Sequence, residues 1–198
     1  MCRRQPMEQL TSELLLAAYG NGIFPMADED SDWEISWYSP AERGVLPLES
    51  FHIPHDLSRL LRQRQFEVTF DRDFEAVMRG CADRDSTWIS EKLVAAYVAL
   101  HEAGHAHSVE CRQEGRLVGG LYGVRLGGAF FGESMFHRVR DASKVALVHL
   151  VERLKQGGFT LLDTQFVTPH LEQFDATEIG REEYLRQLAN ALHIDATW

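Results

Sequence analysis

The sequence has few cysteines and lacks any long apolar run. Its three cysteines, Cys2, Cys81 and Cys111, are an odd number at unrelated spacings. This pattern argues against a disulfide framework or a zinc site and is typical of reduced thiols in a cytoplasmic protein. No stretch approaches the roughly eighteen apolar residues that cross a bilayer, so we expect no membrane-spanning segment. The apolar run at 14–18 is short and follows acidic residues, which is not the pattern of a signal peptide.

The sequence is also short of positive charge. It carries 20 Lys and Arg against 30 Asp and Glu, a formal net charge of −10. That balance argues against broad, non-specific nucleic-acid binding, which depends on many phosphate contacts, and favours an enzyme acting on a small molecule. The charge is uneven, however. Residues 28–34 hold five acids and no base, whereas 52–64 contain Arg59, Arg62 and Arg64 against one acid.

The sequence is rich in apolar residues and in residues typical of turns, and their pattern predicts an α/β (α+β) chain. Hydrophobic residues make up 44% of the 198 positions, enough for a core in a chain of this length. Periodicity and turn residues predict helices, a three-stranded meander, a crossover helix and a parallel strand. The expected helices are 8–19, 54–63, a short one ending at Gly80, one from Ser90 to Gly104, 142–156 and 181–192. The expected strands are 66–70, 105–113, 116–126, 129–136 and 159–165.

This order of elements is typical of an acetyltransferase-like (GNAT-type) mixed sheet. The stretch 23–50 is rich in Pro, Trp and acids and shows no sustained period, so we expect it to be irregular. The domain organisation that follows is a small N-terminal lobe over residues 1–50 and a catalytic domain over residues 51–198.

The segment His101-Glu102-Ala103-Gly104-His105 matches the zinc-hydrolase pattern H-E-x-x-H. A zinc site would need one helix through both histidines and a third ligand. The extended form of the motif fails, because Ser108 and Cys111 stand where Gly and His are required. The alternative, which we favour, is that Gly104 ends the helix and His105 opens a strand. We therefore expect no metal.

The glycine pairs of the sequence do not predict a nucleotide site. None has the layout of a dinucleotide-binding turn or a P-loop. Acetyltransferases hold the pyrophosphate of coenzyme A on a basic, glycine-rich turn before the crossover helix. Here that stretch, 138–144, is basic but has no glycine, so coenzyme A binding is only weakly supported.

Three polar residues are expected to meet where two neighbouring strands end. Glu133 lies late in the strand 129–136, and Asp163 and Gln165 end the strand 159–165. Alternation places Asp163 and Gln165 on one face, and likewise Glu133 and Met135. Polar groups beside apolar surface suit proton transfer. The alternative is structural: Glu133 pairs with a nearby arginine and Asp163 caps a neighbouring element.

At these residues the sequence resembles the leucyl/phenylalanyl-tRNA–protein transferase family. The densest match is Leu117-Val118-Gly119-Gly120-Leu121-Tyr122-Gly123-Val124, Phe131-Gly132-Glu133-Ser134-Met135-Phe136 and Leu162-Asp163-Thr164-Gln165. Further blocks lie at 18–25, 37–40, 80–82, 87–89, 101–108 and 142–144. The resemblance covers about residues 12–190. Met26 stands where the family usually has Trp, and Tyr38 replaces a second Trp.

The resemblance implies an aminoacyltransferase that uses neither a metal nor coenzyme A. Such an enzyme moves Leu or Phe, and Met less readily, from aminoacyl-tRNA to the N-terminal Arg or Lys of a protein. The product is marked for degradation by the N-degron pathway. By resemblance, Asp163 acts through Gln165 as base or proton acceptor, and Glu133 holds the amino group of the aminoacyl moiety. The implied partners are charged tRNA and such proteins, for a cytoplasmic enzyme expected to be a monomer.

The resemblance also implies a pocket for the transferred side chain, and the uneven charge predicts a small basic strip for tRNA. The alternatives are that the pocket residues are ordinary core and that the arginines form a solvated helix face. Apolar walls with a flexible Met suit Leu, Phe and Met. The pocket residues are expected to be Trp88, Leu121, Phe130, Met135 and Leu162. The tRNA contacts are expected to be Arg59, Arg62, Arg64, Arg138 and Arg140. Two alternatives remain open: a coenzyme-A-dependent N-acyltransferase, and a non-catalytic binder of tRNA or peptide.

Overall fold

The computed structural model of the chain describes residues 10–28 and 31–198. Cys2, Glu29, Asp30 and the start of the helix expected at 8–19 lie outside the described residues. Seven helices are described: α1 (Ser12–Gly20), α2 (His55–Gln63), α3 (Phe74–Ala82), α4 (Glu91–Glu102), α5 (Ala142–Gln156), α6 (Pro169–Glu172) and α7 (Arg181–Leu192). The described strands are β1 (Phe24–Asp28), β2 (Glu34–Tyr38), β3 (Glu42–Leu46), β4 (Glu67–Phe70), β5 (Ala106–Gln113), β6 (Arg116–Leu126), β7 (Ala129–His137), β8 (Leu161–Gln165) and β9 (Thr177–Gly180).

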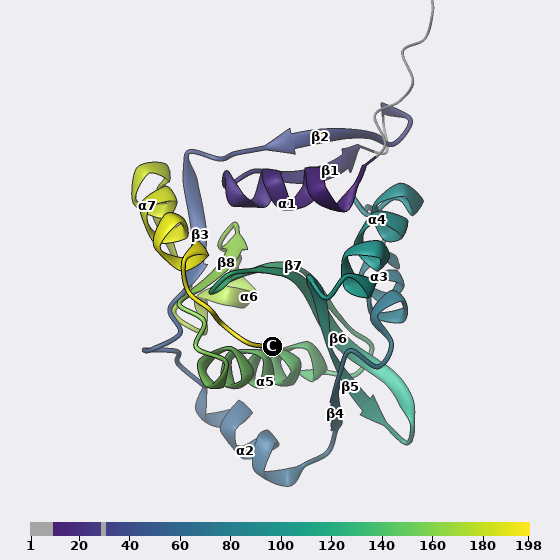
Figure 1. Cartoon of the computed structure of the whole chain (residues 1–198). Helices are drawn as coiled ribbons and strands as arrows, with labels where there is room; N and C mark the ends of the chain where they lie inside the picture. Colours follow the sequence, from purple (N-terminus) through teal and green to yellow (C-terminus); the bar gives the residue numbers. More distant parts are fainter. Residues whose placement is uncertain (1–9, 29–30) are drawn as a thin grey trace, which may run out of the picture.

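A mixed seven-stranded sheet organises the chain (Figure 1). Its strand order is β4-β5-β6-β7-β8-β3-β9, and β1 and β2 form a separate antiparallel pair. The predicted meander is β5-β6-β7, and α5 is the crossover helix that makes β7 and β8 parallel neighbours. The α/β class and the parallel crossover expected from the sequence are confirmed.

Helices cover both faces of this sheet and divide the core into two clusters. One cluster receives buried residues from α1, α3, α4 and α7. The other receives them from α2, α5 and α6. Figure 1 shows α5 along one face, with α1 and the β1–β2 pair on the opposite side of the sheet. The apolar side chains of α5 therefore pack against β5, β6 and β7.

Local signals explain where the helices begin and end. The side chain of Thr11 accepts a hydrogen bond from the backbone N–H of Leu14, and Ser90 accepts one from Leu93. α4 ends at Glu102, and Gly104 then adopts a positive φ of 78°. His105 lies after this turn and before β5, so His101 and His105 do not share a helix face. The favoured alternative is confirmed for the helix end before Gly104, while the strand opens one residue later than expected, at Ala106.

The expectation that 23–50 is irregular is wrong. This stretch contains β1, β2 and β3, and β3 pairs with both β8 and β9 in the large sheet. The partners of β3 lie more than a hundred residues away, and each of the three strands has only five residues, so local periodicity did not reveal them. The boundary at residue 50 stays a prediction, although β3 from the first part completes the sheet of the second. Among the described residues, no helix is long and apolar enough to cross a membrane.

A bulge in β7 places Glu133. The partners of Tyr122 and Gly123 on β7 are Ser134 and Gly132, so Glu133 is an extra residue between them. Such an insertion reverses the alternation of side chains beyond it. Gly123 is required opposite the bulge, because a Cβ there would lie 2.3 Å from the carbonyl oxygen of Phe131.

A second bulge lies at the end of β8. Gly44 and Val45 of β3 pair with Gln165 and Asp163, which leaves Thr164 as the extra residue. Gln165 has a positive φ of 65°, a left-handed conformation that is uncommon outside glycine. Pairing between β7 and β8 reaches no further than Phe131 and Asp163. Both irregularities therefore lie just beyond the point where the two parallel strands part.

We predict that Gly123→Ala lowers the free energy of unfolding by about 1–3 kcal/mol, because the added methyl group overpacks the bulge. Urea denaturation measures this change. The matched control is Gly180→Ala, since a Cβ at Gly180 would meet nothing within 4 Å; its effect should stay within about 0.5 kcal/mol. Equal stabilities for the two variants would contradict the steric account of the bulge.

Candidate active site

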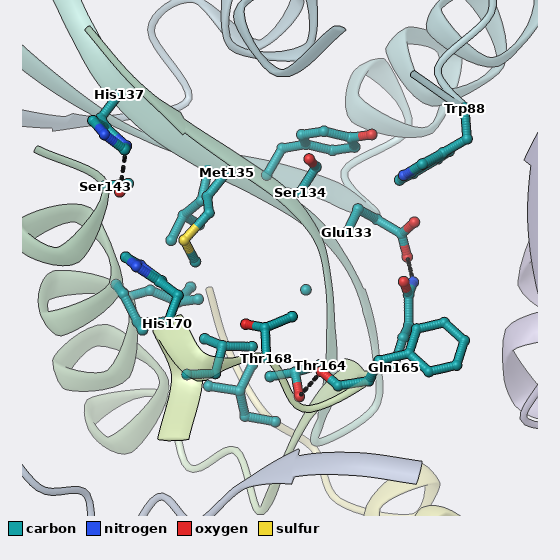
Figure 2. A pocket seen from close by; sticks show the side chains of 18 of the residues that line it. Trp88, Glu133, Ser134, Met135, His137, Ser143, Thr164, Gln165, Thr168 and His170 are labelled. Carbon is teal, nitrogen blue, oxygen red and sulfur yellow. Dashed lines mark hydrogen bonds between the residues drawn. The ribbon is translucent and has the colours of Figure 1, made fainter. Parts of the chain in front are cut away.

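A cavity of about 380 Å³ lies where β7 and β8 diverge. Its apolar lining comes from Trp88, Leu121, Met135, Leu147, Leu150, Leu162, Phe166 and Leu171. Figure 2 shows polar side chains on both sides of Met135: Glu133 and Gln165 on one side, and His137, Ser143 and His170 on the other. The cavity thus joins an apolar centre to two polar ends.

Glu133 is buried among phenols and one amide. Its Oε1 accepts hydrogen bonds from the Tyr19 hydroxyl at 2.7 Å and from Gln165 Nε2 at 2.9 Å. Its Oε2 accepts one from the Tyr97 hydroxyl at 3.3 Å, and the two hydroxyls also contact each other. Burial raises the pKa of the Glu133 carboxyl to about 7, although the hydrogen bonds from Tyr19 and Gln165 oppose that rise. Glu133 therefore changes charge near neutral pH.

Asp163 lies in a different electrostatic environment, in a buried ion pair. Arg43 Nη2 lies 2.7 Å from Asp163 Oδ2, and Arg43 Nε donates to the same carboxylate at 2.9 Å. Asp163 also accepts hydrogen bonds from the Tyr184 hydroxyl at 2.6 Å and from the backbone N–H of Gln165 at 2.7 Å. Asp163 is 0% exposed and is not among the cavity-lining residues. Its carboxylate therefore accepts hydrogen bonds from three residues, and one of them is the backbone N–H of Gln165, whose side chain lines the cavity.

The structure brings the three predicted polar residues together, with one correction. Asp163 and Gln165 lie on the sheet face covered by α1, α4 and α7, where Tyr184 contacts Asp163 and Glu133 contacts Gln165. The expectation that Glu133 and Met135 share a face is wrong. Met135 packs with the cluster on the α5 side, because the bulge at Glu133 reverses the alternation.

Four of the five predicted pocket residues line the cavity, namely Trp88, Leu121, Met135 and Leu162. Phe130 does not line the cavity, so the prediction that it is a pocket residue is wrong. Phe130 precedes the bulge and is fully buried, with its ring stacked on Trp198 at 5.5 Å and edge-on to Phe159. It is a core residue of the α5 layer.

The predicted tRNA arginines fall into two groups. Arg59 and Arg62 are exposed on α2, and Arg64 follows directly in a left-handed conformation. None of the three lines the cavity. Arg138 and Arg140 are exposed between β7 and α5, where Arg138 lies 3.5 Å from Asp83 and Arg140 lies 3.4 Å from Asp141. The second group lies between His137 and Ser143, which both line the cavity, whereas the first group lies on and just after α2, which packs against the outer part of α5.

Several site residues were missed by the sequence reasoning. Arg43, Tyr97 and Tyr184 hold the two carboxylates but come from separate elements, and no local pattern predicts their meeting. Tyr19 belongs to a block that carries the family resemblance. A signal did exist for the cavity wall on α5: Ser143, Leu147 and Leu150 recur at helical spacing and so share one face.

The histidines of the H-E-x-x-H segment, which lie within the described residues, are not arranged as metal ligands. His101 Nδ1 contacts the carbonyl oxygen of Ala106, and His107 Nδ1 contacts Asp71 at 2.8 Å. Across residues 10–28 and 31–198, no group of three or more His, Cys, Asp or Glu side chains is arranged to hold a metal ion. Cys81 and Cys111 are buried free thiols, and burial raises the pKa of each to about 12.

Comparisons with solved structures show the fold. FemX matches with a TM-score of 0.50 at 13% identity, covering 79% of this chain and 60% of that one. A ribosomal-protein-alanine N-acetyltransferase from Brucella melitensis biovar Abortus 2308 matches with a TM-score of 0.40 at 15% identity, covering 55% and 84%. At these identities the likeness concerns fold alone. The likeness to FemX supports the mixed α/β fold expected from the sequence.

Sequence comparisons cover nearly the whole chain. The family model described as leucyl/phenylalanyl-tRNA protein transferase matches residues 45–189, and the model of that family's N-terminal domain matches residues 8–41. The leucyl/phenylalanyl-tRNA–protein transferase of Salinibacter ruber is 56% identical over 96% of this chain and 84% of its own. That of Paramagnetospirillum magneticum is 57% identical over 94% and 91%. The chain therefore belongs to the leucyl/phenylalanyl-tRNA–protein transferase family.

Proposed function

We propose that this transferase moves Leu or Phe, and Met less readily, from aminoacyl-tRNA to the N-terminal Arg or Lys of proteins, forming a peptide bond. The observation that carries the proposal is the pairing of Glu133 and Gln165 at the edge of an apolar cavity. Such a cavity accepts an uncharged side chain, and the polar pair faces the groups that react. Marking the product for degradation follows from this reaction in the family.

Glu133 is the group that holds the substrate's α-amino group. An aminoacyl ester carries a free ammonium next to its reactive carbonyl, and a carboxylate is the natural partner for that charge. Tyr19, Tyr97 and Gln165 already donate to Glu133 and fix its orientation. Because Glu133 lies on one side of Met135, the aminoacyl side chain extends from it into the apolar centre. This arrangement places the ester carbonyl next to Gln165.

Gln165 contacts the attacking amine in this proposal. Its amide nitrogen donates to Glu133, so its carbonyl oxygen is the atom left to accept a hydrogen bond from the incoming N-terminal amine. The amine nitrogen forms a bond to the ester carbonyl carbon, and the bond to the ribose oxygen breaks. The proton lost by the amine is taken up by the departing ribose oxygen. The ester is already activated, so positioning supplies much of the catalysis.

Asp163 is a positioning residue in this scheme. Four donor groups already occupy its carboxylate, and one of them is the backbone N–H of Gln165. It thereby fixes the backbone of Gln165. Asp163→Ala would leave Arg43 buried without a counter-charge, at a cost of about 3–5 kcal/mol, so that variant tests folding and catalysis together.

The apolar centre explains the expected overlap among substrates. One methylene in such a pocket discriminates by only about 1–3 kcal/mol. Met135 adds a flexible side chain that adapts to ligands of different shape. Leu, Phe and Met should therefore all be accepted. We place the reaction in the cytoplasm and treat the enzyme as a monomer.

The first prediction tests the proposed reaction directly. Purified protein given leucyl-tRNA with a radiolabelled leucine should label a peptide that begins with Arg or Lys. A matched peptide that begins with Glu should stay unlabelled. Labelled product is counted after precipitation of the peptide. Absence of transfer to the Arg and Lys peptides by folded protein would refute the proposed function.

The second prediction concerns pH. Since Glu133 must be ionised to hold the ammonium, kcat/KM should rise with pH through about 7, the value to which burial raises its pKa. Glu133→Gln should remove this limb and lower kcat/KM by about 10- to 100-fold, the loss expected for a charged hydrogen bond. The limb from the acceptor amine, with a pKa near 8, should remain in both proteins. An unchanged profile in the variant would rule out this role.

The third prediction concerns the exposed arginines of α2, which we propose contact the body of the tRNA. Binding through a few phosphates is weak and falls steeply with salt. Charge reversal in Arg62→Glu combined with Arg64→Glu should abolish binding in a filter assay at low salt. The control is Arg186→Glu on α7, which should retain it. If binding were unchanged by both the charge reversal and the salt concentration, the tRNA would bind at another surface.

A further inference from the structure

Arg84 is a cation at one end of the cavity, and the reaction proposed above does not use it. It lies in the loop 83–90 between α3 and α4, and it lines the cavity together with Trp88 of the same loop. Figure 2 shows Trp88 and Ser134 at the end of the cavity where Glu133 and Gln165 lie. Arg84 is exposed, so its side chain is open both to the cavity and to solvent. It is therefore placed to contact a ligand that enters or leaves at this end.

Two hydrogen bonds fix the guanidinium of Arg84. Its Nε donates to the carbonyl oxygen of Cys81 at 2.7 Å, and its Nη2 donates to Ser134 Oγ at 2.9 Å. Ser134 follows Glu133 directly in β7, so the positive charge is held close to the residue that takes the ammonium in the proposed reaction. A charged group that is already held in place loses little conformational entropy when it binds a ligand. These two bonds therefore prepare Arg84 for binding.

Most of the hydrogen-bonding capacity of Arg84 is available to a ligand. A guanidinium has five N–H groups, and the two bonds above occupy two of them. Within residues 10–28 and 31–198, Arg84 forms no ion pair with an acid, whereas Arg138 lies 3.5 Å from Asp83. A guanidinium with free N–H groups and no carboxylate partner is well suited to an oxyanion such as a phosphate.

The surface beyond Arg84 favours RNA as the source of that phosphate. A hollow formed by α3, the start of β6 and the residue after β7 is lined by Arg79, Arg116 and Arg138, and Asp83 is the one acid among its described lining residues. Arg79 is paired with two glutamates, which leaves two arginines against Asp83. A polyanion is attracted to such a surface, whereas an acceptor that begins with Arg or Lys is repelled by it.

The donor brings a phosphate to this end of the cavity. A tRNA ends in C-C-A, with the amino acid esterified to the ribose of the last adenosine, and a phosphodiester joins that ribose to the preceding cytidine. In the proposed reaction the ammonium lies at Glu133, the ester carbonyl lies next to Gln165, and the side chain fills the apolar centre. The ribose therefore stays at the end of the cavity that Trp88 and Arg84 line, with the phosphate one ribose further out. Arg84 is the one arginine or lysine among the described residues that line the cavity.

We propose that Arg84 binds the phosphate that joins the last two nucleotides of the donor tRNA. This contact holds the ribose at the end of the cavity, so that the ester stays next to Gln165. The inference rests on the proposed function, because the ammonium at Glu133 sets the direction in which the RNA leaves.

The test compares two small donors that differ in this phosphate alone. Phenylalanine esterified to the ribose of adenosine lacks it, and phenylalanine esterified to the ribose of adenosine 5′-monophosphate carries it. With a peptide that begins with Arg as acceptor, kcat/KM should be at least about tenfold higher for the donor with the phosphate, a gain typical of hydrogen bonds to charged groups. Arg84→Gln should remove most of this gain and leave kcat/KM for the adenosine donor unchanged.

Two further variants control for charge and for folding. Arg84→Lys keeps the charge but loses the planar group with its fixed hydrogen bonds, so it should keep part of the gain. Arg186→Gln removes an exposed arginine of α7 that is paired with Glu183, and it should keep all of the gain. Thermal unfolding shows that each variant is folded.

Three results would overturn the proposal. The first is equal kcat/KM for the two donors in the unaltered protein. The second is an equal loss with both donors in Arg84→Gln, which would mean that Arg84 only supports the loop 83–90. The third is a higher KM for the acceptor peptide in that variant, with the phosphate gain intact, which would place the acceptor at Arg84.

Nucleotide binding is measured without transfer, so the two proposals can fail independently. In isothermal titration calorimetry at low salt, adenosine 5′-monophosphate should bind more tightly than adenosine, and Arg84→Gln should remove the difference. Absent transfer from both donors together with this binding preference would refute the proposed function and keep the phosphate site. Normal transfer with equal binding of the two nucleotides would refute the phosphate site and keep the function.

Discussion

The buried ion pair between Arg43 and Asp163 is the interaction on which the site depends. The guanidinium of Arg43, only 1% exposed, lies 4.5 Å from the ring centroid of Phe24 and 4.6 Å from that of Tyr184. It also donates to the carbonyl oxygen of Gly22. One side chain therefore joins the end of α1, β1 and α7 to the end of β8. Leaving either charge unpaired in this interior would cost several kcal/mol, so these elements stay together as a unit.

The two carboxylates of the site differ because their partners differ. Asp163 faces a guanidinium, whereas Glu133 faces hydroxyls and an amide. Burial without a full counter-charge raises the pKa of Glu133 to about 7. In the reaction we propose, the ammonium of the substrate supplies the charge that Glu133 lacks. Two carboxylates in such different electrostatic environments commonly have different roles in a reaction.

The sequence predicted the regular elements well and the irregular ones poorly. α5 and β5–β7 follow from clear periodicity and glycine turns, and the meeting of Glu133 with Gln165 follows from the parallel crossover. The bulge at Glu133 could not be predicted, because an extra residue leaves no mark in an apolar and glycine-rich strand. The bulge placed Met135 on the opposite face of the sheet from Glu133. Phe130, which precedes the bulge, remained in the core. The role of Arg43 depends on a pairing across 120 residues, which no local window contains.

The net charge of −10 also has a more limited meaning than composition suggests. It describes the whole surface, whereas the proposed contacts to RNA lie in a cavity and on a few exposed arginines. An enzyme that grips the end of a tRNA needs local positive charge and not a basic surface. The net charge of a chain therefore does not exclude a nucleic-acid partner.

The central claim is that Asp163 acts through Gln165 on the substrate held by Glu133, as one coupled unit. A double-mutant cycle on kcat/KM for leucine transfer, with Asp163→Asn, Glu133→Gln and the pair, tests it most directly. The account predicts strong non-additivity, with the pair little worse than Glu133→Gln alone, in proteins shown to be folded by thermal unfolding. Losses that simply add would contradict it.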